Sequence, residues 1–243
     1  MSNVRKNDQR VGLPTKGIGD TLVVTDRHLC GGIAPLVQAV DASVVGGIHM
    51  VQLREKDLPP QELLALAQSL RSVTKDRALL FVNVHDAAGV EIAQACGADG
   101  LQLAEAALPV EWARQLVGDE MLIGRSVHNL EGALAAAESE ADLLILGTVF
   151  PSATHPEGTT VGVELVRTVT EHVATPVYGI GGITAENAAQ VLEAGASGVA
   201  VVRAVLAAPD PKQAARRLLL VMDAGHALHR PVRRGSNAER DPI

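Results

Sequence analysis

Short apolar runs alternate with amphipathic segments along most of the chain. The runs predict eight strands, at Thr21–Asp26, Met50–Arg54, Leu79–Val84, Gly100–Ala104, Leu122–Val127, Leu143–Phe150, Pro176–Ile180 and Gly198–Val202. The segments between them have helical spacing of apolar residues, most clearly in Gln61–Val73, Asn187–Ala194 and Lys212–Met222. Strands that alternate with helices predict βα units and a parallel sheet.

A weak internal repeat favours closure of these units into a barrel. In Gly46–Leu53, Gly97–Leu103 and Gly195–Val201, a helix ends at glycine, a tight turn follows and a strand begins. An open doubly wound sheet would carry a glycine-rich fingerprint after its first strand, where this chain reads Thr25–His28. We predict a single α/β domain, a (β/α)8 TIM barrel over residues 21–228, with a flexible arm at 1–20 and a disordered tail at 229–243.

Composition narrows the class of protein. Of the 243 residues, 47% are hydrophobic but only 2% aromatic, which excludes wholesale disorder and predicts an aliphatic core. A net charge of −7 and the shortage of aromatic rings argue against a nucleic-acid partner. No apolar run is long enough to span a membrane and the N-terminal residues lack a signal-peptide core, so we expect no membrane partner and a cytoplasmic location. Cys30 and Cys96 are then expected to be unpaired thiols.

The second predicted strand carries a cationic carboxyl end. Active sites of this fold lie at the carboxyl ends of the strands, so polar residues there are candidates for chemistry. Gln52, Arg54 and Lys56 point the same way because strand side chains alternate between faces. Two cations and an amide predict a clamp for phosphate or diphosphate. The alternative is a structural role, in which Arg54 pairs with a neighbouring carboxylate.

Later strands add amides, a hydroxyl and a histidine at the same end. Asn83 ends the third strand, Gln102 lies on the fourth, and Ser126 and His128 share a face of the fifth. His128 is a candidate acid or base, although a rim histidine satisfied by the backbone is an equal alternative. Asp86 is expected to cap a helix.

The loops after the last three strands provide candidate phosphate contacts. A long polar loop follows the sixth strand, and it is interpreted as a binding loop, with a mobile surface loop as the alternative. Phosphate sites of this fold recur after strands seven and eight, where glycines let the backbone approach an anion. The candidates in these loops are Ser152, Thr154, His155, Gly182, Val202 and Arg203.

These segments, taken in order, resemble the thiamine phosphate synthase and TenI superfamily. The resemblance covers about Leu22 to Leu220 and rests on Val23–Asp26, Val51–Lys56, Gly97–Leu103, Ile123–His128, Gly147–Pro151, Ile180–Ile183 and Val199–Val202. It implies a thiamine-biosynthesis enzyme with a small phosphorylated heterocycle as substrate, and it suggests a homodimer. The synthase branch couples a hydroxymethylpyrimidine diphosphate to a thiazole phosphate and releases diphosphate.

The resemblance also implies roles for the candidate residues. Gln52 would face the pyrimidine, and the diphosphate would be held by Arg54, Lys56, Asn83 and Ser126. The thiazole phosphate would lie against Ser152 and Thr154, with its phosphate at Gly182 and the backbone near Val202 and Arg203.

Several positions depart from the synthase pattern. That pattern has an Asp directly after the third-strand Asn and another beyond the fourth strand, and these carboxylates hold Mg²⁺. Here the positions hold Val84 and the pair Ala106 and Ala107, so hard oxygen ligands are missing and we expect no metal cofactor unless the protein is a synthase. His155 stands where a lysine is expected.

The TenI branch, which tautomerises a thiazole phosphate carboxylate, needs no metal. Gln102–Leu103, without an Asp cluster, is closer to that branch, but the branch's acid/base histidine is Thr148 here. Of the nearby candidates His128, His155 and Glu105, we favour His128 for proton transfer and His155 for phosphate contact. We therefore expect a thiazole tautomerase, with a thiamine phosphate synthase as the first alternative and a catalytically silent phosphate binder as the second.

Overall fold

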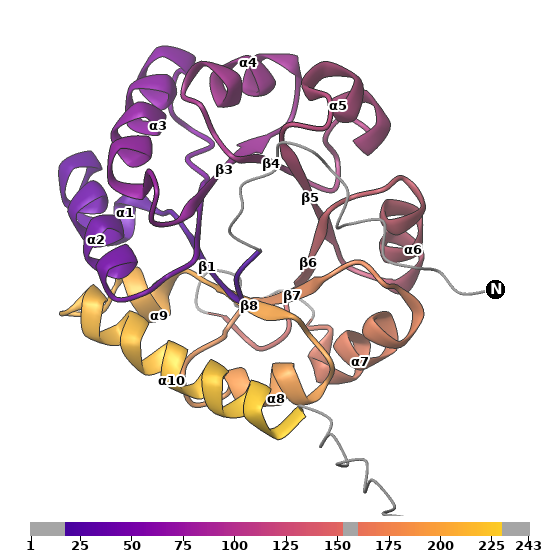
Figure 1. Ribbon diagram of the computed structural model, residues 1–243. Helices are drawn as coiled ribbons and strands as arrows, with labels where there is room; N and C mark the ends of the chain where they lie inside the picture. The colour runs from indigo at the N-terminus through magenta and orange to yellow at the C-terminus, as the bar shows by residue number, and fades with distance from the viewer. Residues whose placement is uncertain (1–17, 153–159, 230–243) are drawn as a thin grey trace, which may run out of the picture.

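A closed barrel of parallel strands forms the centre of the molecule (Figure 1). The computed structural model describes residues 18–152 and 160–229. The strands are β1 (Thr21–Val24), β2 (Met50–Leu53), β3 (Leu79–Val84), β4 (Gly100–Leu103), β5 (Leu122–Val127), β6 (Leu143–Gly147), β7 (Val177–Ile180) and β8 (Gly198–Val201). Each lies within a predicted run, and pairing of β1 with β8 closes the ring, so the predicted (β/α)8 barrel is confirmed.

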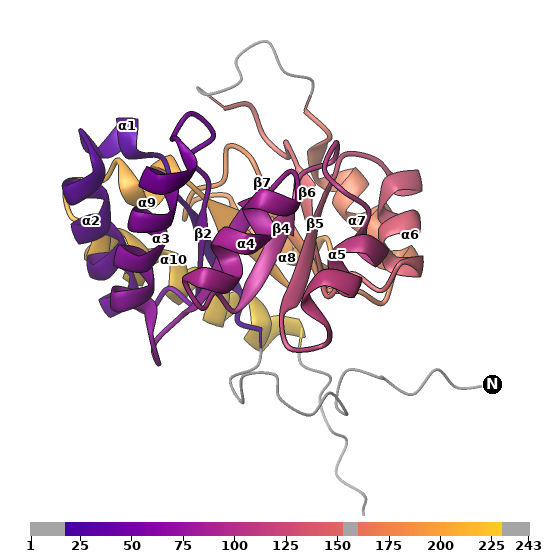
Figure 2. The same cartoon turned by 90° about the horizontal axis from the view of Figure 1, so that it is seen from above.

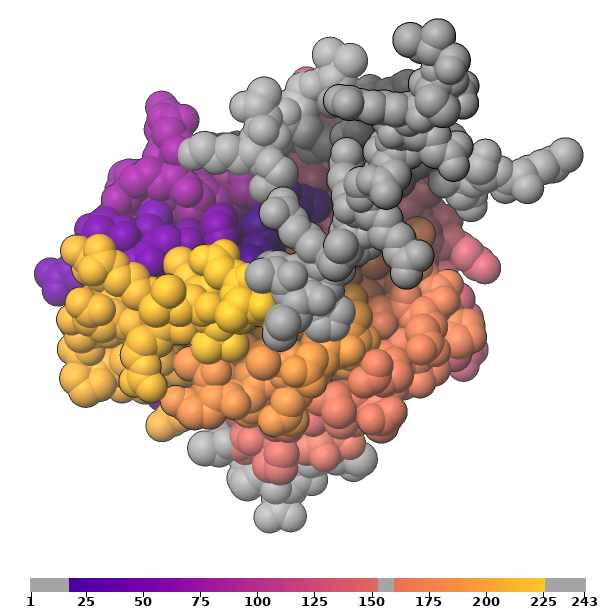
Figure 3. Space-filling view, turned by 60° about the horizontal axis from the view of Figure 1, so that its bottom comes forward, coloured from indigo at the N-terminus to yellow at the C-terminus, as the bar shows by residue number. Residues whose placement is uncertain are grey.

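Helices cover the outside of the barrel. They are α1 (Arg27–Cys30), α2 (Ile33–Val45), α3 (Pro60–Thr74), α4 (Ala87–Ala95), α5 (Val110–Val117), α6 (Leu130–Glu138), α7 (Gly162–His172), α8 (Ala188–Glu193), α9 (Arg203–Leu206) and α10 (Pro211–His229). The C-terminal helix α10 packs between α2 and α8 and completes the outer layer (Figure 3). Asp86 caps α4, as expected, by accepting a hydrogen bond from the Gly89 amide. Among the described helices, none is long and apolar enough to cross a membrane.

The predicted terminal segments are largely beyond what the structure describes. The arm at 1–20 overlaps the described part only at residues 18–20, and β1 begins directly after it at Thr21. The tail at 229–243 overlaps only at His229, which ends α10.

Glycines make room for the bulkiest side chains inside the barrel. Phe81 on β3 is paired in register with Gly100 on β4, and Gln102 on β4 is paired with Gly124 on β5. A Cβ atom at Gly100 would overlap the Phe81 ring, and one at Gly124 would overlap the Gln102 amide oxygen. Interiors are packed closely enough that such an overlap forces a shift. The small neighbour on the next strand therefore fixes where each large inward side chain lies.

The two faces of each strand serve different layers of the core. On β3, Leu79 and Phe81 belong to the interior cluster, whereas Leu80, Val82 and Val84 pack in the cluster beneath the helices. Asn83 continues the interior face at the carboxyl end of the strand. Figure 2 shows the barrel from the side, with the loops that follow the strands at the top.

Gly124→Ala tests the filling of the barrel. The methyl group would displace the Gln102 amide, and overpacking of this kind should lower the free energy of unfolding by about 1–3 kcal/mol. Urea denaturation measures the change. Gly132→Ala on α6 is the control, because its Cβ would contact only the Asn129 Oδ1 atom, at 3.3 Å, and alanine favours helices. An equal loss of stability in both variants would contradict the role given to Gly124.

Candidate active site

The carboxyl end of β2 presents an amide and two cations at the barrel mouth. Gln52 is buried, and its Nε2 donates a hydrogen bond to the Asn83 Oδ1 on β3 at 3.3 Å. The side chains of Arg54 and Lys56 are exposed beyond it. The positive charge of Arg54, helped by partial burial, lowers the pKa of Lys56. The two cations therefore lie close enough to repel each other, which is the arrangement expected of a clamp for an anion.

The carboxylates next to these cations are already neutralised by another residue. Glu55 is buried and accepts hydrogen bonds from both the backbone amide and the Nη1 of Arg27, each at 3.0 Å. Asp57 binds the same guanidinium through both oxygens, at 2.7 and 2.6 Å, and these bonds hold the pKa of Asp57 well below its usual range. Among the described residues, neither Glu55 nor Asp57 pairs with Arg54, and the role of Arg54 in binding an anion stays a prediction.

Two further hydrogen bonds order the interior wall of the mouth. Asn83 Nδ2 lies 3.3 Å from the His85 Nε2, so Asn83 bridges Gln52 and His85. Gln102 is buried, and its Nε2 donates to the Ser126 Oγ on β5 at 3.0 Å. The structure thus brings Gln52, Asn83, Gln102 and Ser126 to one end of the barrel, on consecutive strands.

His128 and Glu105 lie side by side on the same rim. Their Nδ1 and Oε2 atoms are 3.0 Å apart, and the two side chains are 51% and 59% exposed. Arg125 secures the loop that carries Glu105 by donating to the backbone oxygens of Glu105 and Leu108, at 2.8 and 3.0 Å. His128 therefore has a carboxylate partner rather than a backbone one, and its catalytic role stays a prediction.

The β7–α8 loop passes directly over the β6 loop. Gly182 has φ of +62°, and a Cβ there would overlap the Pro151 carbonyl oxygen. Asn187 fixes the loop by donating to the Gly182 carbonyl at 2.9 Å. Ser152 is half-buried beside this loop, whereas Thr154 and His155 lie outside the described residues. Val202 precedes the short helix α9, which Arg203 begins.

The residues at the mouth do not fit the magnesium site that the synthase branch implies. Val84 is fully buried on the face of β3 that packs under the helices, and Ala107 has no oxygen in its side chain. Within residues 18–152 and 160–229, no three His, Cys, Asp or Glu side chains gather in a way that could hold a metal ion. Mg²⁺ is usually held by one or two protein carboxylates together with substrate phosphates. The chain has no carboxylate at the positions of Val84 and Ala107.

Sequence reasoning missed the residues that support the site. Arg27, His85 and Arg125 act through contacts with other strands or loops, which no local pattern predicts. The strand-based argument for the two cations is also wrong: β2 ends at Leu53, so Arg54 and Lys56 lie in the following loop, where alternation between strand faces does not apply.

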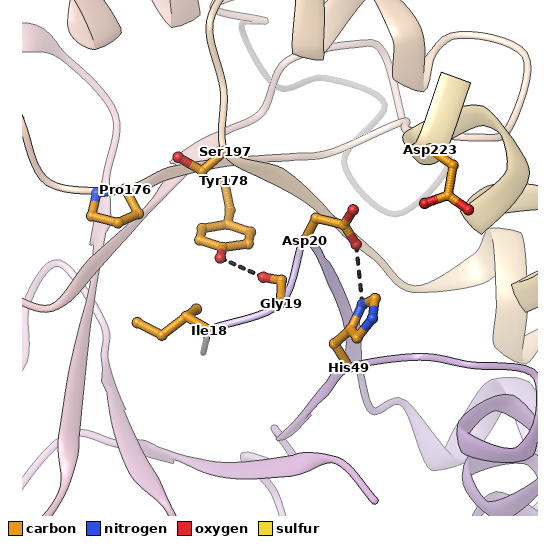
Figure 4. A pocket seen from close by; sticks show the side chains of 8 residues that line it. All are labelled: Ile18, Gly19, Asp20, His49, Pro176, Tyr178, Ser197 and Asp223. Carbon is orange, nitrogen blue, oxygen red and sulfur yellow. Dashed lines mark hydrogen bonds and ion pairs between the residues drawn. The ribbon is translucent and has the colours of Figure 1, made fainter. Parts of the chain in front are cut away.

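A separate cavity of about 500 Å³ opens at the opposite end of the barrel (Figure 4). His49 and Asp20 face each other there, with the His49 Nδ1 and Asp20 Oδ1 3.1 Å apart, and this contact raises the pKa of His49. The Tyr178 hydroxyl closes the inner wall by donating to the Gly19 carbonyl at 2.5 Å. Because the cavity lies at the amino ends of the strands, it is distinct from the mouth that holds the clamp.

Fold and site together define a (β/α)8 barrel with a cationic, amide-lined mouth. The family model for thiamine monophosphate synthase matches residues 21–205. A protein of Geobacter sulfurreducens, provisionally named a thiamine-phosphate synthase, is 42% identical, covering 82% of this chain and 92% of that protein. The thiamine-phosphate synthase of Roseiflexus is 39% identical, over 85% of this chain and 86% of the relative. The chain belongs to the thiamine monophosphate synthase family.

A solved structure supports the same assignment. Thiamine phosphate pyrophosphorylase from Pyrococcus furiosus is 36% identical, with a TM-score of 0.76 over 85% of this chain and 96% of that one. These relatives carry synthase or pyrophosphorylase names, so the expectation of a tautomerase is not supported and the synthase alternative is favoured. The absence of the two aspartates had weighed toward the tautomerase, but it concerns two positions, whereas the similarity extends over most of the chain.

Gly182→Ala tests the predicted phosphate contact in the β7–α8 loop. Gly97, which precedes β4 at the other end of the barrel, is the control, because its φ is also positive, at +66°, and nothing lies within 4 Å of its Cβ position. Both variants should lose about 1–2 kcal/mol of stability from the left-handed backbone, and Gly182→Ala should lose more, because its Cβ would also overlap the Pro151 carbonyl oxygen. Only Gly182→Ala should also weaken binding of inorganic phosphate, by about tenfold or more, in calorimetry. Equal phosphate affinity in the two variants would argue against a site at Gly182.

Proposed function

We propose that the protein is a thiamine phosphate synthase, which joins a hydroxymethylpyrimidine diphosphate to a thiazole phosphate. The observation that carries the proposal is the mouth itself, where Gln52 presents a buried amide and where, among the described residues, Arg54 and Lys56 have no carboxylate partner. Relatives of 36–42% identity with synthase or pyrophosphorylase names support the same reaction.

The chemistry makes one bond and breaks one. The thiazole nitrogen attacks the methylene carbon of the pyrimidine, and the bond from that carbon to the diphosphate oxygen breaks, so its electron pair leaves with diphosphate. Negative charge grows on the leaving oxygens as the bond breaks. Arg54 and Lys56 are placed to stabilise that charge, and cations that meet charge as it develops lower the barrier.

The remaining side chains bind and orient the two substrates. Gln52 is held toward the barrel axis by its bond to Asn83, so its amide is available to the edge of a pyrimidine ring. Ser126 on β5, fixed by Gln102, provides a hydroxyl at the same end of the barrel. Gly182, in the loop over β6, is suited to the thiazole phosphate because its backbone has no side chain in the way.

Incubation of the purified chain with both substrates should yield thiamine phosphate, detected by chromatography. Gln52→Ala removes one amide contact, so it should raise the KM for the pyrimidine diphosphate about fivefold and leave the KM for the thiazole phosphate unchanged. Lack of product from the folded wild-type protein, with and without MgCl2, would refute the proposal. An equal rise of both KM values would instead refute the place given to the pyrimidine.

His128→Asn distinguishes coupling from proton transfer. Coupling moves no proton, so the variant should keep kcat within about threefold, whereas loss of a general acid or base costs roughly 10²–10⁴-fold. Asn preserves a polar group beside Glu105. Steady-state rates of thiamine phosphate formation measure the effect, and a loss of several hundredfold with normal folding would restore a chemical role for His128.

A further inference from the structure

The cations of the mouth, Arg54 and Lys56, have no neutralising partner among residues 18–152 and 160–229. Within the described residues, the side chains of Arg54 and Lys56 form no ion pair, and they are exposed. The acidic groups nearest in sequence, Glu55 and Asp57, are occupied by Arg27. Arg54 and Lys56 repel each other, which lowers the pKa of Lys56, and an anion between them would replace this repulsion with attraction.

The same mouth lacks the groups that would hold a divalent ion against that anion. The position after Asn83 carries a buried aliphatic side chain that faces the helices, and Ala107 offers no ligand. The carboxylates at this end of the barrel have other partners. Glu105 Oε2 lies 3.0 Å from the His128 Nδ1, Glu55 and Asp57 bind Arg27, and Asp86 accepts the Gly89 amide at the start of α4. A metal bound to diphosphate here would lie beside the cations Arg54 and Lys56, and the side chains of Val84 and Ala107 would offer it no oxygen ligand.

We propose that this barrel mouth holds the diphosphate group directly through Arg54 and Lys56, without a bridging divalent cation. The inference rests on the proposed function for the identity of the natural ligand. Guanidinium and ammonium groups bind phosphate oxygens through charge-assisted hydrogen bonds, and they replace the charge that a metal would supply. A divalent ion bound to diphosphate removes part of the negative charge that attracts the clamp, so Mg²⁺ competes with the protein instead of assisting it.

Titration calorimetry of the full-length chain with inorganic diphosphate tests the clamp. Diphosphate should bind in EDTA, and replacing EDTA with millimolar MgCl2 should leave the affinity unchanged or lower it. Arg54→Ala should weaken binding in EDTA by about 10- to 150-fold, the fold-change equivalent to one charge-assisted hydrogen bond. Lys56→Ala should act in the same direction and serves as a second variant if the first folds poorly.

Lys75→Ala is the charge-matched control. Lys75 is exposed at the end of α3, next to the amino end of β3. The substitution therefore removes one positive charge far from the mouth. At physiological ionic strength, exposed charges beyond about 8 Å are largely screened, and this variant should bind diphosphate within about twofold of the wild type. Diphosphate binding that requires MgCl2, or that falls equally in the Arg54 and Lys75 variants, would overturn the clamp.

A coupling assay run beside the calorimetry separates this inference from the proposed function. Diphosphate binding in EDTA without any thiamine phosphate formed would refute the synthase reaction and leave the metal-free clamp in place. Diphosphate binding and coupling that both appear only with MgCl2 would refute the clamp and leave the synthase reaction. Coupling in EDTA at a rate comparable to that in MgCl2 would support both.

Discussion

The barrel depends on a steric constraint between neighbouring strands. Its largest inward side chains are accommodated because the residue paired with each of them on the next strand is glycine. Phe81 faces Gly100, Gln102 faces Gly124 and, on the far side, Tyr178 faces Gly198 in the same register. A parallel barrel has a fixed interior width, so a large residue on one strand requires a small one beside it. This constraint sets both the aliphatic filling and the position of the Gln102 amide at the mouth.

The two ends of the barrel use charge in opposite ways. At the amino end, Asp99 pairs with Arg71 and accepts the Leu80 amide, at 2.6 and 2.7 Å. Asp142 repeats this arrangement two strands further on, with Arg114 and the Ile123 amide, at 2.6 and 2.8 Å. Charges there are matched and partly buried, so they join helices to strands.

At the carboxyl end, by contrast, Arg27 binds the two carboxylates, Glu55 and Asp57, that could otherwise neutralise Arg54 and Lys56. Its guanidinium ties the start of α1 to Glu55 and Asp57, so neither carboxylate pairs with Arg54 or Lys56. The site is therefore a product of one ion-pair network that satisfies its anions and leaves its cations unmatched. Such an arrangement costs stability in the empty protein and favours an anionic substrate.

The sequence alone determined the strands, their number and the parallel barrel, because short apolar runs between helical segments are a local property of the chain. It also pointed to Arg54 and Lys56, although these residues lie in the loop after β2 and not on the strand. It also led to the correct family, although two missing aspartates directed the choice of reaction toward the tautomerase. Tertiary structure decided which charges stay unmatched, that Val84 lies under the helices, and that Gly182 has no room for a side chain over Pro151. These outcomes depend on distances between segments far apart in the chain, such as Arg27 and Asp57, and such distances exist only once the barrel has closed.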